Sequence, residues 1–327
     1  MTRAAVALVL TIGIARAPAT TEPPIRPPAS AHRVNSVHIT VLSTMLADKG
    51  VGEWGFAALI EADGHRLLFD TGDRPETVLQ NARELGIDLS TVTEVVLSHH
   101  HGDHTGGLLS LRRELAKANP AALSRIHVAP GIFVSRRKAG SDAEANPTIA
   151  LKDAVEAGGG VFIEHRGPVE LLPGVWLTGP VPRRYPERNW GAPMSIVTAR
   201  GLVPDSIPED MALVVNTDKG LVVVTGCGHA GTINTLEYAR EVVAPEPLYA
   251  LIGGLHLFAA TEEALAWTAG KLRAAGLVNL LGAHCTGIEA VFRIRQLAGL
   301  TRRTAVVAAV GSSFDLDRGI DPLALAQ

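Results

Sequence analysis

The 327-residue sequence contains only two cysteines, and aromatic residues make up just 4% of it. Two cysteines are too few for a disulfide framework, so the 46% of apolar residues must build the core that holds the fold. Neither sign of charge dominates, because 30 basic and 33 acidic side chains leave a net charge of -3. A protein with such a balance has no strong positive electrostatic field that would attract nucleic acid or anionic lipid. We expect a small-molecule substrate and no nucleic-acid partner, and the sequence indicates no oligomeric state.

The apolar run at the N-terminus is too short to cross a bilayer, which takes about 20 residues. This run, residues 4–15, follows Arg3 and precedes small residues, as in a secretory signal peptide. We predict a signal peptide at residues 1–19, a proline-rich linker at 20–35 and one domain at 36–327. The protein is then exported, periplasmic or secreted, with no stable membrane insertion after cleavage. If the run is only an apolar extension, the protein is cytoplasmic.

From residue 36 onward the sequence alternates between strand and helix patterns, which predicts a large α/β domain. Three short strands come first, and Asp73 is expected to cap a helix that ends at Gly86. Residues 130–208 are rich in glycine and proline and are expected to form strands and surface loops. A hairpin at residues 211–226 then leads into further alternating helices and strands.

The strongest motif is the string SHHHGDHTGG at residues 98–107, which follows an apolar strand. On an extended backbone His99 and His101 point to the same side. The chain then turns into a helix, so Asp103 and His104 can project into the same pocket. Imidazole and carboxylate ligands of this kind suit a borderline cation such as zinc.

The histidine between these positions, His100, points away in this interpretation and is not a ligand. The alternative is a surface histidine cluster that binds metal only adventitiously. The ligand spacing, the strand that precedes it and the flanking glycines all favour a true metal site.

Residues 36–314 resemble the metallo-β-lactamase superfamily. The resemblance lies in the order of elements along the chain: a strand, the motif FDTG, a helix, a second strand and the motif SHHHGDHTGG. The strings TGCGHAG at 225–231, IGGLHL at 252–257 and AHCTG at 283–287 resemble a narrower group within it. That group is the dihydropteroate synthase-like branch, named for 7,8-dihydropterin-6-methyl-4-(β-D-ribofuranosyl)aminobenzene 5′-phosphate synthase. The resemblance implies an αββα sandwich, in which two mixed β-sheets are flanked by helices and the ligands lie at one edge.

The resemblance also implies a centre of one or two ions, with zinc expected and iron or manganese possible. The expected ligands are His99, His101, Asp103, His104 and His284. Asp70 in FDTG would be the buried carboxylate that orients the histidine loop, although a plain turn-forming aspartate is the alternative. A further histidine is needed, and His229 is the candidate on its chemistry and its GCGHAG string.

Cys227 occupies the place where most superfamily members carry a bridging aspartate. It can act as a soft thiolate ligand or leave that place to water, and a single disulfide with Cys285 is a minority alternative. His256 can be a ligand, a proton donor to a leaving group, or a core histidine at a strand end.

A basic run in the middle of the chain offers a possible anion site. Arg183 and Arg184, with Arg188 nearby, can bind an anionic part of the substrate. A solvated basic loop is the alternative.

The expected function is a metal-dependent hydrolase, in which metal-bound hydroxide attacks an ester, lactone, amide or phosphoester. Asp103 would hold the nucleophile in line. The alternative is a transferase of the dihydropteroate synthase-like type, which displaces pyrophosphate from a pterin; export argues against it, because pterin intermediates are cytoplasmic. A non-catalytic, metal-dependent binding protein is a third possibility.

Overall fold

The computed structural model describes residues 32–187 and 193–324. The predicted signal peptide and most of the proline-rich linker lie outside these residues. Folded structure extends slightly upstream of residue 36, because the backbone N of Val34 donates to the carbonyl of Asn216 at 2.8 Å. Among the described residues, no helix is long and apolar enough to span a membrane.

The first sheet is mixed and runs in the order β18-β17-β1-β2-β3-β4-β5-β7. Strands β3, β4, β5 and β7 are parallel, whereas the other neighbours are antiparallel. The strands are β1 (Val37–Ser43), β2 (Ala57–Ala62), β3 (His65–Phe69), β4 (Glu94–Val96), β5 (Arg125–Val128), β7 (Val161–Glu164), β17 (Ser313–Asp315) and β18 (Gly319–Asp321).

The second sheet is also mixed, in the order β16-β15-β14-β13-β12-β9-β8. Strands β13 to β16 are parallel, and the β12–β13 pair is the antiparallel hairpin that the sequence predicts. The strands are β8 (Val169–Leu172), β9 (Val175–Leu177), β12 (Ala212–Thr217), β13 (Gly220–Thr225), β14 (Leu248–Gly253), β15 (Asn279–Gly282) and β16 (Ala305–Val307).

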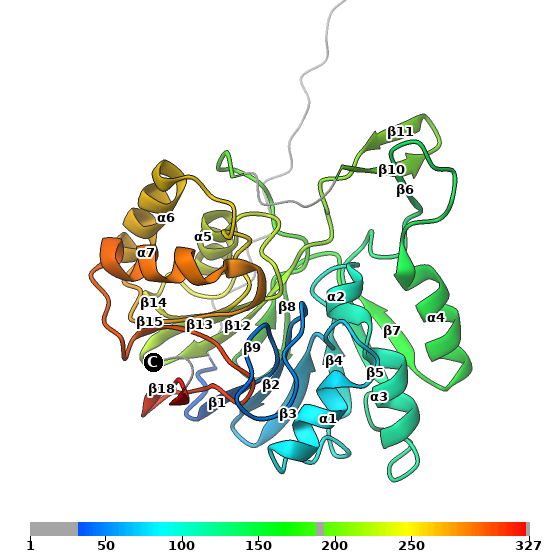
Figure 1. The fold of residues 1–327 in the computed structure, drawn as a ribbon, viewed down its shortest axis with the longest axis horizontal. Coiled ribbons are helices and arrows are strands. Elements are labelled where there is room, and N and C mark those ends of the chain that lie inside the picture. Colours follow the sequence, from blue (N-terminus) through cyan, green and yellow to red (C-terminus); the bar gives the residue numbers. More distant parts are fainter. Residues whose placement is uncertain (1–31, 188–192, 325–327) are drawn as a thin grey trace, which may run out of the picture.

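The two sheets pack face to face through a buried apolar core. Ile39 and Phe69 of the first sheet lie in one cluster with Leu213, Val224 and Ile252 of the second. In two further apolar clusters, the helices pack against the outer faces of the two sheets (Figure 1). The helices are α1 (Thr77–Glu84), α2 (Gly102–Thr105), α3 (Leu108–Leu115), α4 (Pro147–Ala157), α5 (Thr232–Val242), α6 (Glu262–Ala274) and α7 (Ile288–Ala298). Helices α1, α3 and α4 cover the first sheet and α5, α6 and α7 the second, which confirms the predicted αββα sandwich.

A small third sheet projects from this sandwich (Figure 1). It consists of β6 (Arg136–Lys138), β10 (Met194–Thr198) and β11 (Gly201–Pro204), all antiparallel. The strands come from the middle of the chain, which was expected to contain only strands and loops. Helix α4 also lies there, so that part of the expectation is wrong.

Two other local predictions are wrong. Asp73 does not cap α1, whose N-cap is Glu76, and that residue makes no side-chain cap bond. The preceding turn is held instead by the buried carboxylate of Glu53, which accepts from the backbone N of Asp73 and of Arg74 at 3.0 Å each. The sequence pattern also predicts AVVAAVG, residues 305–311, as the last strand; this is wrong, because β17 and β18 follow it and extend the first sheet beyond β1.

Candidate metal centre

The candidate ligands lie at the carboxyl ends of parallel strands from both sheets. The histidine string follows β4, and Asp70 follows its parallel neighbour β3. Cys227 and His229 follow β13, His256 follows β14, and His284 and Cys285 follow β15. Parallel strands end at one edge of a sheet, so the fold brings these side chains together.

Asp70 is a buried carboxylate that accepts several hydrogen bonds at this edge of the sheets. Its Oδ1 accepts from the backbone N of Ser98, and its Oδ2 accepts from Ser98 Oγ and from His104 Nδ1, all at 2.7 Å. Because Ser98 Oγ gives its one hydrogen to Asp70, it must accept from His99 Nδ1, which lies 2.9 Å away. Both imidazoles therefore turn Nε2 toward the centre, and Asp70 lies where the sequence predicts an orienting carboxylate.

The histidines differ in their electrostatic environment. Burial and the neighbouring imidazoles lower the pKa of His99 and of His101 well below the usual range, which keeps both in the neutral form that binds metals. Burial also lowers the pKa of His104, but the carboxylates of Asp70 and Asp103 outweigh this effect and raise it to about 9. The surroundings of His104 thus favour a positive charge, which a proton or a cation can supply.

The sulfur of Cys227 lies where the ligand groups meet. It forms one possible metal-binding triad with His99 and His229, and a second with His104 and His284. In each triad the ligand atoms lie within 4.8 Å of one another. The distance from Cys227 Sγ to His104 Nε2 is 3.1 Å. Cys227 is a free thiol, so it is available to both triads.

His101 and Asp103 complete the cluster on its more open side. The His101 ring lies 4.6 Å from that of His99 and 4.9 Å from that of His229, between centroids. Asp103 Oδ2 lies 3.3 Å from His284 Nε2 and 3.9 Å from His104 Nε2. Burial raises the pKa of Asp103, but His104 and His284 outweigh it and hold the pKa well below the usual range. Asp103 is therefore an ionised carboxylate.

His256 and Cys285 form a third possible triad with Cys227. The two sulfurs are 3.2 Å apart, and both cysteines are free and buried. The His256 ring lies 4.6 Å from that of His229, and His256 Nδ1 has no hydrogen-bond partner in the part of the chain that the structure describes. His256 is partly exposed and has a left-handed φ of 51°.

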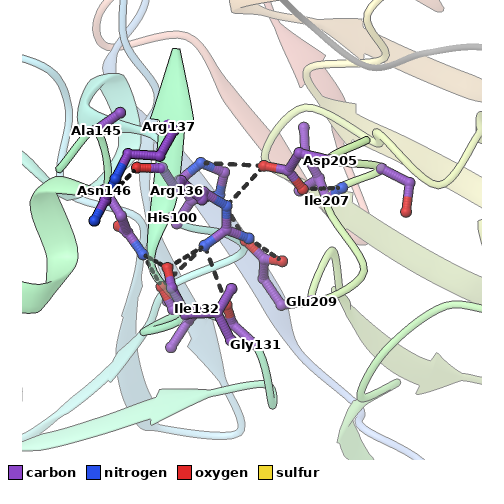
Figure 2. A network of polar contacts seen from close by, with 12 residues as sticks. His100, Gly131, Ile132, Arg136, Arg137, Ala145, Asn146, Asp205, Ile207 and Glu209 are labelled. Atoms are coloured by element: carbon purple, nitrogen blue, oxygen red, sulfur yellow. Dashed lines mark hydrogen bonds and ion pairs between the residues drawn. The ribbon is translucent and has the colours of Figure 1, made fainter. Parts of the chain in front are cut away.

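His100 lies outside all three triads. Its Nδ1 donates to Glu209 Oε1 at 2.6 Å, on the side facing a buried ion-pair network (Figure 2).

Glycines make this close convergence possible. A Cβ atom on Gly226 would lie 2.0 Å from Ser98 Oγ and 2.5 Å from Asp70 Oδ2. A Cβ on Gly106 would lie 1.8 Å from the carbonyl of Asp73. Neither position can accept a side chain, because the neighbouring atoms belong to the backbone or to the buried side chains of Ser98 and Asp70.

The predicted anion-binding arginines contact other parts of the protein. Arg183 Nη2 donates to the carbonyls of Ser206, Ile207 and His229, the last at 3.4 Å. Arg184 pairs with Glu241 on α5. Arg188 lies outside the described residues, and anion binding by this run stays a prediction.

Two aromatic residues at the mouth of the cluster were not predicted. Trp54 and Phe258 are 47% and 53% exposed and meet edge to face at 5.8 Å between ring centroids. The Trp54 ring lies 4.8 Å from that of His284, and the Phe258 ring 5.3 Å from that of His256. Phe258 is two residues after His256, so its position could have been inferred, whereas nothing local links Trp54 to the cluster.

The sequence is similar to known proteins over most of its length. Residues 55–179 match the profile of the metallo-beta-lactamase superfamily. The chain is 29% identical over 270 residues to a 7,8-dihydropterin-6-methyl-4-(beta-D-ribofuranosyl)-aminobenzene-5′-phosphate synthase of Methanocaldococcus jannaschii, covering 79% of this chain and 90% of that protein.

Two solved structures support the same fold. A metal-dependent hydrolase of the beta-lactamase superfamily superposes with a TM-score of 0.69 at 26% identity, over 85% of this chain and 98% of that one. The metallo-beta-lactamase fold protein YhfI of Bacillus subtilis superposes with a TM-score of 0.53 at 14% identity, over 86% and 100%.

Proposed function

We propose that the chain, whose residues 55–179 match the metallo-beta-lactamase superfamily, is a metal-dependent hydrolase of small molecules. The observation that supports this proposal best is the convergence of imidazoles, a carboxylate and a thiol around Cys227. His99 adds a specific indication, because its buried Nε2 has no hydrogen-bond partner among the described residues. A buried nitrogen of this kind is costly unless something binds it.

The donor set fits one or two divalent ions. His99, His101 and His229 would hold one ion, and Asp103, His104 and His284 the other, with Cys227 between them. Zinc is the first expectation for nitrogen and sulfur donors, and iron or manganese are alternatives. The bound ion would supply Lewis acidity, which lowers the pKa of water and polarises a carbonyl or phosphoryl oxygen.

The protein's own groups have separate tasks in this proposal. Asp103, which is ionised and 20% exposed, accepts a hydrogen bond from the attacking water through Oδ2 and holds it in line. His256 is partly exposed and is the candidate proton donor to the leaving group. Trp54 and Phe258 pack against the apolar part of the substrate and exclude water.

The substrate is an ester, a lactone, an amide or a phosphoester, each of which has an oxygen that a cation can polarise. A transferase that displaces pyrophosphate from a pterin is the second candidate. It is favoured by the similarity to the Methanocaldococcus jannaschii synthase over 90% of that protein's length.

A substrate screen with metal-loaded and chelated protein tests the proposal. Turnover of generic ester, lactone or phosphodiester probes, lost on chelation and restored by metal, supports the hydrolase. Pyrophosphate release from a pterin diphosphate that requires an arylamine supports the transferase. Metal-loaded protein that turns over neither set contradicts both.

Two variants should accompany the screen. His101→Asn removes a candidate ligand and is expected to abolish turnover. His127→Asn removes an equally well-held histidine, which bonds Glu94 at 2.6 Å and contacts no candidate ligand, and should retain turnover.

A further inference from the structure

Residues 205–211, here called the 205–211 strap, cross behind two of the loops that carry candidate metal ligands. At the histidine string, the backbone N of Met211 donates to the carbonyl of Ser98 at 3.1 Å, and Glu209 accepts from His100. At the other loop, Asp210 Oδ2 accepts from the backbone N of Ala230 at 2.8 Å. Ala230 directly follows His229, so the strap contacts the neighbours of ligands in both loops.

The strap is fastened by Arg136, a fully buried arginine on β6 of the small third sheet (Figure 2). Its Nε donates to Asp205 Oδ2 at 2.7 Å, and its Nη2 donates to both carboxylate oxygens of Glu209 at 2.8 Å. The third nitrogen, Nη1, donates to the carbonyl of Gly131 at 3.1 Å. One guanidinium thus joins two residues of the strap, Asp205 and Glu209, and its planar fork of donors suits this arrangement.

The strap is also held in a strained conformation. Ile207 is buried and has a φ of 55°, a region that β-branched residues rarely adopt. Its backbone N donates to Asp205 Oδ1 at 2.8 Å, and its carbonyl accepts from Arg183 at 3.0 Å. Side chains of Asp205 and Arg183 therefore hold the peptide groups on both sides of the strained Ile207.

From these contacts we propose that the 205–211 strap positions the metal ligands and that Arg136 and His100 are positioning residues within it. His100 lies between His99 and His101, so fixing its ring against Glu209 fixes the backbone that carries both ligands. Arg183 acts on the second loop, because it also contacts the carbonyl of His229. The inference rests on the proposed metal centre and assigns the third sheet a part in building it.

The test compares two buried arginines. Arg136→Met should weaken metal affinity about 10- to 100-fold, the usual effect of losing a partner behind the ligands. Arg112→Met is the control, because Arg112 is also buried but, among the described residues, bonds only the carbonyls of Pro120, Ala122 and Gly158. It should lower the melting temperature and leave metal affinity unchanged. Arg136→Lys keeps the charge without the fork and should fall between wild type and Arg136→Met.

Metal affinity is measured by competition with a chromogenic chelator, and ligand geometry by the visible spectrum of the cobalt-loaded protein. Arg136→Met that binds cobalt as tightly as wild type, with the same spectrum, overturns the inference. If that variant does not fold, Glu209→Gln decides, because it keeps the side-chain shape and removes the carboxylate that holds His100. Wild-type protein that binds no metal contradicts the proposed function instead, so the two failures are distinguishable.

Discussion

At the residue scale, the most unusual feature is a thiol at the centre of a histidine and carboxylate cluster. Cys227 belongs to all three possible triads, whereas Cys285 belongs to one. Its sulfur lies 3.1 Å from His104 Nε2, close enough for both atoms to bind one ion. In the metal-free protein, burial raises the pKa of the Cys227 thiol well above its ordinary range, so we propose that Cys227 becomes a thiolate ligand only once an ion is bound.

Cobalt substitution tests this role. Cobalt-loaded wild type should show a near-ultraviolet thiolate-to-metal charge-transfer band, because cobalt occupies sites that suit zinc. Cys227→Asp should lose the band and keep its metal through an oxygen ligand, and Cys285→Ser should keep the band. If Cys285→Ser loses the band while Cys227→Asp keeps it, Cys227 is not the ligand. A native protein without free thiols would lead to the same conclusion.

His104 predicts a pH dependence for the metal-free protein. Its pKa in the folded state is about 9, above the ordinary 6.5. Such a histidine stabilises the fold fully below about pH 6.5, and this contribution disappears as the pH rises through about 9. A pKa difference of this size corresponds to about 3 kcal/mol.

Urea unfolding of chelated protein at about pH 6 and about pH 10 measures this effect. The metal-loaded protein is the control and should lose less stability over the same range, because the ion replaces the proton on Nε2. Equal losses in both forms would mean that His104 does not face the ion.

At the element scale, the sequence predicted the parts of the fold that have a clear period. The strands that deliver Asp70, the histidine string and His284 lie where alternation and glycine signals place them. Helix α4 was missed, although Asn146 and Pro147 are a start signal and Asn146 does cap the helix. The surrounding glycines and prolines outweighed that signal.

Long-range contacts account for what the sequence could not predict in the site. Nothing near Arg136 in the chain indicates that its partners are Asp205 and Glu209, about 70 residues away. Glu53 similarly replaces Asp73 in holding the turn before α1, from a loop 20 residues upstream. Periodicity and motif spacing report only on neighbours in sequence, so these residues needed the fold.

The loops that carry Trp54 and Phe258 supply a prediction on substrate binding. Trp54→Ala should raise KM roughly three- to tenfold with little change in kcat, because an aromatic contact contributes about 1 kcal/mol. Trp267→Ala is the matched control, since Trp267 is 37% exposed on α6 and packs on Tyr185, not on the cluster. If both variants have the wild-type KM for the substrate found in the screen, the aromatic pair does not contact it.

At the scale of the whole molecule, we propose that the protein is exported. The mature chain should begin at or near Thr20, after cleavage that follows Ala19. N-terminal sequencing of protein isolated from its natural source checks this. Material that begins at Met1 or Thr2 would contradict export and remove the objection to a cytoplasmic pterin transferase.

The central claim is that the whole αββα sandwich assembles one metal centre at the shared edge of its two sheets. Elemental analysis of protein expressed with ample metal tests it most directly, beside a His99→Ala/His101→Ala double variant. We predict about one to two equivalents of zinc, iron or manganese per wild-type chain and a clear loss in the double variant. Wild-type protein with less than about a tenth of an equivalent, or equal metal in both proteins, would contradict the account.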